Sequence, residues 1–423
     1  MSTYKIPYYK DHLTLELSDD RVAGVLTSKT EEYNPGLSQE ELVRNALANP
    51  VASKKLEELV LGKKHVVIIS SDHTRPVPSH ITMPILLETI RKANSDIKIS
   101  ILIATGMHRP TTHEELVNKY GEEIVKNENI VIHNAYLDEE MTFKGILPSG
   151  GELWINKLVD EADLLISEGF IEPHFFAGFS GGRKSVLPGI ASKKTVLWNH
   201  NAKFIASPFS RAGSIDENPI HKDMLFAAKT AGLAFILNVV INSEKKIIAA
   251  YSGDVELAHK EGREFVASLA QVKPVYSDIV ITSNGGYPLD QNMYQTVKGL
   301  SAGEASVNQN GVIIIAASCV DGHGGEFFYK LIAESKDAKE ANDKLNGVEP
   351  SDTEFDQWEA QVLARILCKA NVIVVSKDCD PKLFTDMHMM HAYTIEEAIE
   401  KAEKLVGKKQ ITLIPDGIAV IVK

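Results

Sequence analysis

The chain has 423 residues, and its 45 basic and 57 acidic side chains give a net charge of −12. Hydrophobic residues make up 44% and charged residues 24%, which is typical of a globular protein and excludes a disordered or collagen-like chain. The acidic balance argues against a nucleic-acid partner, because phosphate backbones require a basic surface. Three cysteines without a C-x-x-C pair exclude a disulfide framework, a zinc ribbon and a thioredoxin-type motif.

The N-terminal segment lacks the apolar h-region of a signal peptide. The sequence also has no apolar run of about 18 residues, the length that a membrane-spanning helix needs. We therefore expect a cytoplasmic protein without a membrane partner.

Short runs rich in β-branched residues alternate with helical patterns along most of the chain, which predicts an α/β fold with mostly parallel sheets. The predicted strands are 65–70, 98–104, 130–133, 163–167, 234–241, 278–282, 312–317, 371–375, 410–415 and 418–422. Helices are predicted from about 81, from 112, and over 254–269, 290–300, 357–369 and 394–406. Thr112 with Glu115 and Thr394 with Glu397 have the spacing of capping boxes. The polar stretch 271–277 is the best candidate domain boundary.

Four loops that follow predicted strands carry most of the unusual residues. They are 71–76, 105–110, 168–189 and 284–290. Ligands in open α/β folds bind beyond the carboxyl ends of the strands, so the placement of these loops is consistent with one shared site.

The segment 168–185 combines glycines with Arg183 and Lys184, a composition that suits a phosphate. It nearly matches a P-loop, but Arg183 stands where that motif requires glycine. A Gly-rich turn with solvated cations is the competing interpretation. Lys184 could be a phosphate-binding cation, a covalent anchor for an electrophile, or a surface lysine.

His108, His174 and His200 lie in loops or beside Gly-rich segments, so each could be a general base, a metal ligand or a structural residue. Their spacing matches no local metal motif. Gln295 and Lys298 are three residues apart on a predicted helix and could clamp a carboxylate, with Arg75 as a bidentate partner. A solvated helical face is the alternative for this pair.

These patterns leave several function classes open. One is an NTPase that uses the loop 178–185, although the irregular motif counts against it. Another is a non-catalytic protein that binds small carboxylates. The residues alone lead to a cytoplasmic α/β protein with an anion-lined site and candidate acid/base histidines.

Four long motifs resemble those of the nickel-dependent lactate racemases. They are SSDHTRPVPS (70–79), ATGMHRP (104–110), GFIEPHFFAGFSGGRKSVLPGIAS (169–192) and NGGYPLDQNMYQTVKG (284–299). The resemblance covers essentially the whole chain. It implies two α/β domains with the active site in the cleft between them: a cofactor-binding domain over 1–270, to which 410–423 return, and a second domain over 275–405.

The resemblance also implies a cofactor, a nickel-pincer nucleotide (pyridinium-3,5-bisthiocarboxylic acid mononucleotide). Lys184 would hold it covalently as a thioamide, and His200 would be the sole protein ligand to nickel. The other cofactor-binding residues would be Asp72, His73, Thr74, Arg75, Gly181, Gly182 and Arg183. His108 and His174 would be the catalytic acid/base pair, and the substrate would be bound by Arg75, Gln295, Lys298 and Trp358.

The implied reaction interconverts D- and L-lactate through hydride transfer coupled to proton transfer, with pyruvate as the intermediate. Two bases are needed because the two enantiomers present their hydroxyl groups in different directions from one carboxylate anchor. Related enzymes with this cofactor act on other 2-hydroxy acids, which is the alternative within the family. Proteins that make the cofactor and insert nickel would be transient partners.

Overall fold

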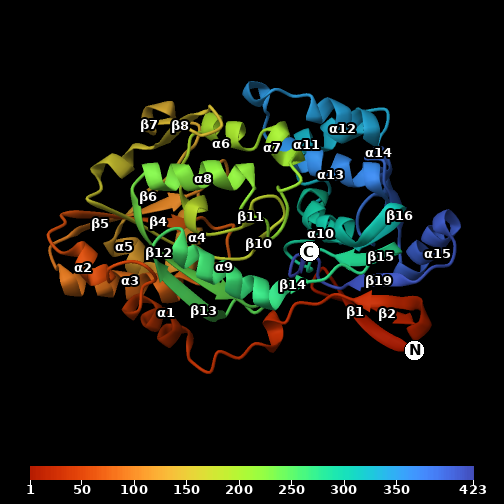
Figure 1. Ribbon diagram of the computed structural model, residues 1–423, viewed down its shortest axis with the longest axis horizontal. Coiled ribbons are helices and arrows are strands. Elements are labelled where there is room, and N and C mark those ends of the chain that lie inside the picture. Colours follow the sequence, from red (N-terminus) through yellow and green to blue (C-terminus); the bar gives the residue numbers. More distant parts are fainter. The chain divides into compact units, whose positions relative to one another are not determined.

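The computed structural model describes residues 1–423 and contains two compact units (Figure 1). Unit 1 comprises Met1–Lys29, His200–Gly213 and Leu269–Lys423, and unit 2 comprises Thr30–Asn199 and Ser214–Ser268. Each unit is built around its own six-stranded sheet. The prediction of an α/β protein with two domains and mostly parallel sheets is therefore confirmed.

The sheet of unit 2 is parallel except at one edge, where β12 and β13 are antiparallel. Its order is β13 (Ile247–Gly253), β12 (Leu233–Ile241), β9 (Leu164–Phe170), β4 (His65–Ser71), β5 (Lys98–Ala104) and β6 (Asn129–Ile132). The central strands are buried on both faces, which explains their uninterrupted apolar runs. Because β4, β5 and β9 are parallel neighbours, the loops that follow them emerge at the same edge of the sheet.

Helices cover both faces of this sheet. One face forms a continuous apolar core with α1 (Gln39–Ala48), α2 (Leu56–Val60), α3 (Ser79–Ala93) and α4 (His113–Tyr120). The predicted capping box at the start of α4 is present, since Thr112 and Glu115 bond each other's backbone N–H groups. The short helix η5 (Gly182–Ser185) packs on β4 and β9, and α8 (Pro219–Thr230) packs on η5 and β12.

The remaining elements of unit 2 connect or extend this arrangement. They are η2 (Thr30–Glu32), α5 (Glu122–Asn127), η3 (Asp138–Glu140), β7 (Met141–Ile146), β8 (Glu152–Asn156), η4 (Lys157–Glu161), β10 (Pro173–His174), β11 (Gly178–Phe179), α6 (Lys193–Asn199) and α9 (Leu257–Ala270, whose last two residues belong to unit 1). No helix of the chain has both the length and the apolar composition that a membrane crossing requires.

The sheet of unit 1 is parallel throughout. Its order is β18 (Met390–Ala392), β17 (Asn371–Val375), β16 (Val307–Ala316), β15 (Ser277–Ser283), β19 (Ile411–Ile414) and β3 (Val22–Val25). The hairpin of β1 (Ser2–Tyr8) and β2 (Asp11–Leu17) packs with α15 (Ile395–Val406) on one face. On the other face, α10 (Met293–Ser306) packs on β15 and β16, and α13 (Gln357–Lys369) packs on α10.

Unit 1 also contains several short elements. They are η1 (Asp19–Arg21), α7 (Ala202–Ala206), β14 (Gln271–Val272), α11 (Glu326–Ala333), α12 (Ala338–Asn346), η6 (Pro350–Asp352), α14 (Pro381–Asp386) and β20 (Ile421–Val422). The helices α7, α12 and α13 pack together. This arrangement places His200, just before α7, in the same unit as Trp358 on α13.

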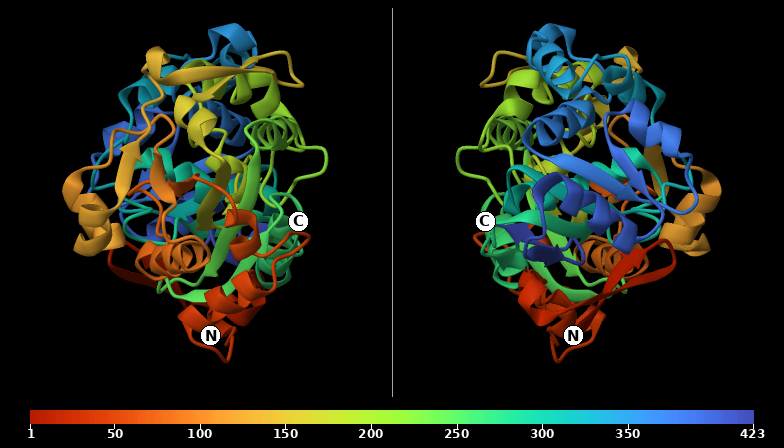
Figure 2. Two further views of the ribbon diagram at one scale, coloured as in Figure 1. Left: turned by 90° about the vertical axis from the view of Figure 1, so that its left-hand side faces the viewer. Right: turned by 90° about the vertical axis from the view of Figure 1, so that its right-hand side faces the viewer.

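The two ends of the chain correct the predicted domain limits. Residues 410–423 were expected to return to the first domain, but β19 lies between β15 and β3 in the sheet of unit 1. Buried Ile411 and Leu413 join the core beneath the β1–β2 hairpin, so main-chain pairing and apolar burial both hold this strand there. Residues 1–29 belong to the same unit, and the red hairpin lies beside the blue C-terminal segments in Figure 1 and in the right-hand view of Figure 2.

Candidate active site

The loops after β4 and β5 bring together Asp72 and His108. The carboxylate Oδ2 of Asp72 lies 2.8 Å from Nδ1 of His108, and its Oδ1 accepts hydrogen bonds from the hydroxyl (2.7 Å) and backbone N–H (3.2 Å) of Thr74. Asp72 is 1% exposed, whereas the side chain of His108 is 42% exposed. The buried carboxylate therefore holds one ring nitrogen of a histidine whose ring is open to solvent.

The charge state of Asp72 fixes the tautomer of His108. Burial by itself would raise the pKa of Asp72, but the hydrogen bond and charge of His108, the charge of Arg75 and the Thr74 hydroxyl together lower it. An ionised Asp72 can only accept at Oδ2, so Nδ1 of His108 carries the hydrogen. The lone pair of the neutral ring then lies on Nε2, which can act as a base.

Two neighbours in the loop after β4 differ in their surroundings. Nδ1 of His73 lies 3.1 Å from the Thr111 hydroxyl and 3.7 Å from the Glu115 carboxylate, so its ring is turned toward the start of α4. Burial lowers the pKa of His73. Arg75 is exposed, and its charge contributes to the low pKa of Asp72.

The Gly-rich segment places His174 and Lys184 around one aromatic ring. His174 lies on β10, and its ring centroid is 4.6 Å from that of Phe176, in an edge-to-face arrangement. Nδ1 of His174 accepts the backbone N–H of Ala177 at 3.3 Å, so in the neutral ring the hydrogen lies on Nε2. Lys184 lies on η5 with Nζ 5.9 Å from the centroid of the same Phe176 ring.

The glycines of this segment have structural roles. Gly181 has a φ of +75°, and a Cβ there would lie 2.6 Å from the carbonyl oxygen of Phe170. The N–H of Gly182 donates to Oδ1 of Asn238 at 2.7 Å, and the N–H of Lys184 donates to the carbonyl of Gly181. These two N–H groups are already used, which counts against a P-loop cradle in which backbone N–H groups bind phosphate.

Arg183 points into the interior of unit 2. Its side chain is 1% exposed, and its guanidinium donates to the carbonyl oxygens of Ala177 (2.7 Å) and Phe179 (2.8 Å). Its Nε donates to Nδ1 of His221 on α8 at 3.0 Å. Arg183 therefore ties the Gly-rich segment to α8, although the sequence placed it among the nucleotide-binding residues.

The other four predicted site residues belong to unit 1 and form two pairs, Gln295 with Lys298 and His200 with Trp358. On α10, Nζ of Lys298 donates to Oε1 of Gln295 at 2.6 Å, one helical turn away. His200 is 5% exposed, and its ring lies 5.1 Å from that of Trp358, edge to face. The Gln295–Lys298 pair and the His200–Trp358 pair are thus each formed within unit 1.

Two buried glutamates near these residues escaped the sequence analysis. Glu168, at the end of β9, accepts hydrogen bonds from the hydroxyls of Ser70, Ser79 and Thr82 and so fixes both ends of the loop that carries Asp72. A lone acid in the apolar run LLISEGF was the available signal. Glu359 on α13 is also buried, and its Oε1 has no hydrogen-bond partner.

Burial, opposed by the charge of Lys298 and aided by that of Asp356, raises the pKa of Glu359 to about 8. The group therefore takes up a proton on folding at neutral pH, and the folded state loses stability as pH rises toward 8. Glu359→Gln should remove this loss. In urea unfolding, the free energy of unfolding of the variant relative to the wild type should therefore rise by about 3 kcal/mol from pH 5 to pH 8. Exposed Glu334→Gln is the control, and parallel pH profiles for Glu359→Gln and wild type would contradict the assignment.

The described chain has no group of three or more His, Cys, Asp or Glu side chains that could hold a metal ion. The polar groups of the candidate site are the hydrogen-bonded Asp72–His108 pair, the imidazoles of His174 and His200, the amine of Lys184 and the Gln295–Lys298 pair.

Comparison with known proteins identifies the family. Residues 8–213 match the lactate racemase N-terminal domain, and residues 272–422 match the lactate racemase C-terminal domain. The chain is 54% identical to a lactate racemase of Thermoanaerobacterium thermosaccharolyticum and 55% identical to one of Lactiplantibacillus plantarum, with 100% of both chains covered in each case.

Solved structures agree with this assignment. The lactate racemase apoprotein from T. thermosaccharolyticum matches with a TM-score of 0.96 and 53% identity over 100% of both chains. A protein from Thermotoga maritima matches 92% of this chain with a TM-score of 0.62 and 20% identity, which shows a shared fold only. The chain therefore belongs to the lactate racemase family.

Proposed function

We propose that this enzyme, an isomerase, interconverts D- and L-lactate. The observation that carries the proposal is the full-length identity of 54–55% to two lactate racemases, because it spans both units and every candidate residue. The Asp72–His108 pair adds a base of defined tautomer, which the transfer of a hydroxyl proton needs.

The residues fit a nickel-pincer nucleotide better than a metal bound by protein alone. The chain has no cluster of three protein ligands, so most ligands of a nickel ion would come from the cofactor. His200 would supply one imidazole. The primary amine of Lys184 is the group that would bind the cofactor covalently as a thioamide, and Asp72, His73, Thr74 and Arg75 would hold the nucleotide. When bound, such a cofactor supplies an acceptor for the α-hydrogen of lactate as hydride.

His108 and His174 would exchange the hydroxyl proton of the substrate. Nε2 of His108 accepts the proton from one enantiomer while Asp72 stabilises the imidazolium that forms. Removal of the hydroxyl proton together with the α-hydrogen as hydride would leave planar pyruvate. In its imidazolium form, His174 on β10 would return a proton to the oxygen as the opposite enantiomer forms; Nδ1 then carries a hydrogen and no longer accepts from the Ala177 N–H.

The substrate carboxylate would be held by Arg75, Gln295 and Lys298. A guanidinium and an ammonium supply charge-assisted hydrogen bonds, and the Gln295 amide orients Lys298. Trp358 would form an apolar wall against the small methyl group. Arg75 belongs to unit 2, and Gln295, Lys298 and Trp358 belong to unit 1.

The test is a chiral lactate assay on protein produced together with the enzymes that make the cofactor and insert nickel. We expect conversion of either enantiomer to the racemate, and a loss of about 10²-fold or more in both His108→Ala and His174→Ala. Conversion that persists in both variants would overturn the assigned roles. A parallel panel of other 2-hydroxy acids tests lactate as the substrate, since faster turnover of another acid would reassign it within the family.

A further inference from the structure

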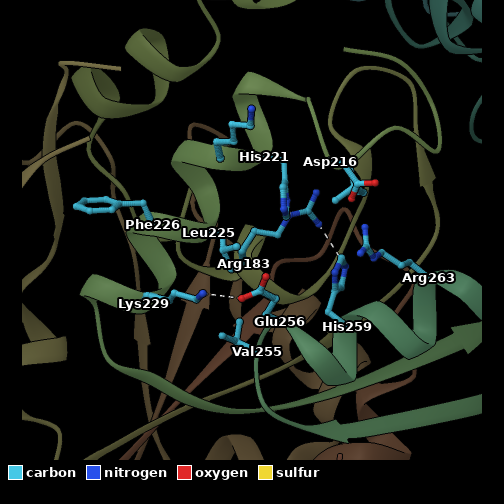
Figure 3. Close-up of a pocket in the computed structure, with 12 residues that line it drawn as sticks. Arg183, Asp216, His221, Leu225, Phe226, Lys229, Val255, Glu256, His259 and Arg263 are labelled. Atoms are coloured by element: carbon cyan, nitrogen blue, oxygen red, sulfur yellow. Dashed lines mark hydrogen bonds and ion pairs between the residues drawn. The ribbon is translucent and has the colours of Figure 1, made fainter. Parts of the chain in front are cut away.

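A cavity of about 440 Å³ lies in unit 2 between α8 and α9 (Figure 3). Its walls include four cationic side chains and two histidines: Arg183, Arg263, Lys222, Lys229, His221 and His259. Of these, only Arg183 was among the residues predicted to bind the cofactor. This concentration of cations is unusual in a chain with a net charge of −12.

Arg183 is a buried cation without an acidic partner. Its hydrogen bonds go to the carbonyl oxygens of Ala177, Phe179 and Gly181 and to Nδ1 of His221, and its Nη1 lies 3.2 Å from Nε2 of His259; none of these groups is an acid. Burial and, to a smaller extent, the nearby charge of Arg263 lower its pKa to about 9, so it stays protonated at neutral pH. Buried charges in proteins are ordinarily paired with opposite charges, and this one faces a second cation instead.

Arg263 on α9 also lacks a direct partner. Lys222 and Lys229 form ion pairs with Glu217 (3.0 Å) and Glu256 (2.5 Å), but Arg263 forms no hydrogen bond or ion pair. Asp216 and Glu256 are the acids on the cavity wall, and Asp216 is not close enough to Arg263 for an ion pair. Two unpaired guanidinium groups, Arg183 and Arg263, thus face one unpaired carboxylate.

The positive charges around the cavity help to lower the pKa of both histidines, His221 and His259. Burial, together with the smaller effects of the charges of Arg183, Arg263, Lys222 and Lys229, lowers the pKa of His221 to about 3. Burial and the charges of Arg183, Arg263 and His221 also hold the pKa of His259 well below its usual value, against the hydrogen bond to Ser180. In neutral His221, Nδ1 accepts from Arg183, so Nε2 carries a hydrogen that can be donated to a ligand.

We propose that this cavity binds a small organic phosphate, whose phosphate group is held by the Arg263 guanidinium and Nε2–H of His221 beside the buried charge of Arg183. A phosphate dianion balances two guanidinium groups, and the planar guanidinium suits bidentate binding. The cavity is larger than a phosphate ion requires, and Leu225, Val255 and Ile215 offer apolar surface to the organic part.

Occupancy of the cavity would act on the Gly-rich segment through Arg183. The Arg183 guanidinium binds the carbonyls of Ala177 and Phe179, and Arg183 precedes Lys184 in the chain. An anion that fixes Arg183 would therefore reduce the mobility of residues 177–184. The binding proposal itself does not depend on racemase activity.

The experiment titrates the full chain calorimetrically with glycerol phosphate, sulfate and acetate. Sulfate serves as a tetrahedral dianion that does not titrate near neutral pH. We expect saturable binding with glycerol phosphate tightest, and similar sulfate binding at pH 6 and pH 8, because Nδ1 of His221 already accepts from Arg183 and the ring stays neutral.

Arg263→Gln should weaken glycerol phosphate binding by about tenfold or more, since it removes a charge-assisted contact. The matched control is Arg44→Gln, which removes the same charge from an exposed position on α1. No saturable binding, equal weakening in both variants, or acetate binding as tight as glycerol phosphate would each overturn the proposal. Loss of lactate turnover has no bearing on these outcomes, so the two proposals fail separately.

Discussion

Replacing Asp72 with asparagine should lower kcat/KM for lactate racemisation by about 10²–10⁴-fold. The reason is the orientation of the new amide. Two donors from Thr74, its hydroxyl and its N–H, point at Oδ1 of residue 72, so the asparagine oxygen takes that position. Its NH₂ group then faces Nδ1 of His108, which must accept, and the ring hydrogen moves to Nε2. The base that faces the substrate is lost although the shape of the site is kept.

The measurement is a chiral assay in both directions on cofactor-loaded protein. D- and L-lactate are mirror images with equal free energies, so kcat/KM must fall by the same factor for both. Asp96→Asn, at an exposed position before β5, is the matched control and should keep full activity. Activity of Asp72→Asn within a few fold of the wild type would contradict the tautomer argument. Recovery at high pH would assign the effect to charge rather than tautomer.

Local sequence patterns predicted much of the fold because each pattern reports its immediate surroundings. Uninterrupted apolar runs identified β4, β5 and β17, which are buried strands of parallel sheets. The capping box at Thr112 and the limits of α13 also match the structure. Three-residue spacing on α10 was enough to place Gln295 beside Lys298.

The features that the sequence missed depend on contacts between distant segments. The local sequence of strand 411–414 does not predict which strand it pairs with. Its position in the sheet follows from its pairing with β15. The composition of the Gly-rich segment suited a phosphate, and the family resemblance implied that Arg183 binds the nucleotide cofactor. The direction of its side chain is set by carbonyl groups and by His221, 38 residues away. The Asp72–His108 bond likewise joins loops 36 residues apart.

Lys184→Arg should abolish racemisation and leave residue 184 without an adduct. The substitution keeps the positive charge but replaces a primary amine with a guanidinium, which does not form the proposed thioamide. The side chain is partly buried beside the Phe176 ring, so arginine is expected to be tolerated by the fold. Intact and peptide mass spectrometry of protein made with the cofactor-producing enzymes measures the adduct, and the chiral lactate assay measures the activity.

The matched control is Lys194→Arg, because Lys194 is an exposed lysine ten residues further along that pairs with Glu152. This variant should carry the same adduct mass on Lys184 as the wild type and remain active. An active Lys184→Arg protein with no adduct would show that covalent attachment is unnecessary, and an adduct on another lysine would place the cofactor elsewhere. Loss of both adduct and activity in Lys184→Arg alone ties the chemistry to the amine and not to its charge, since arginine retains that charge.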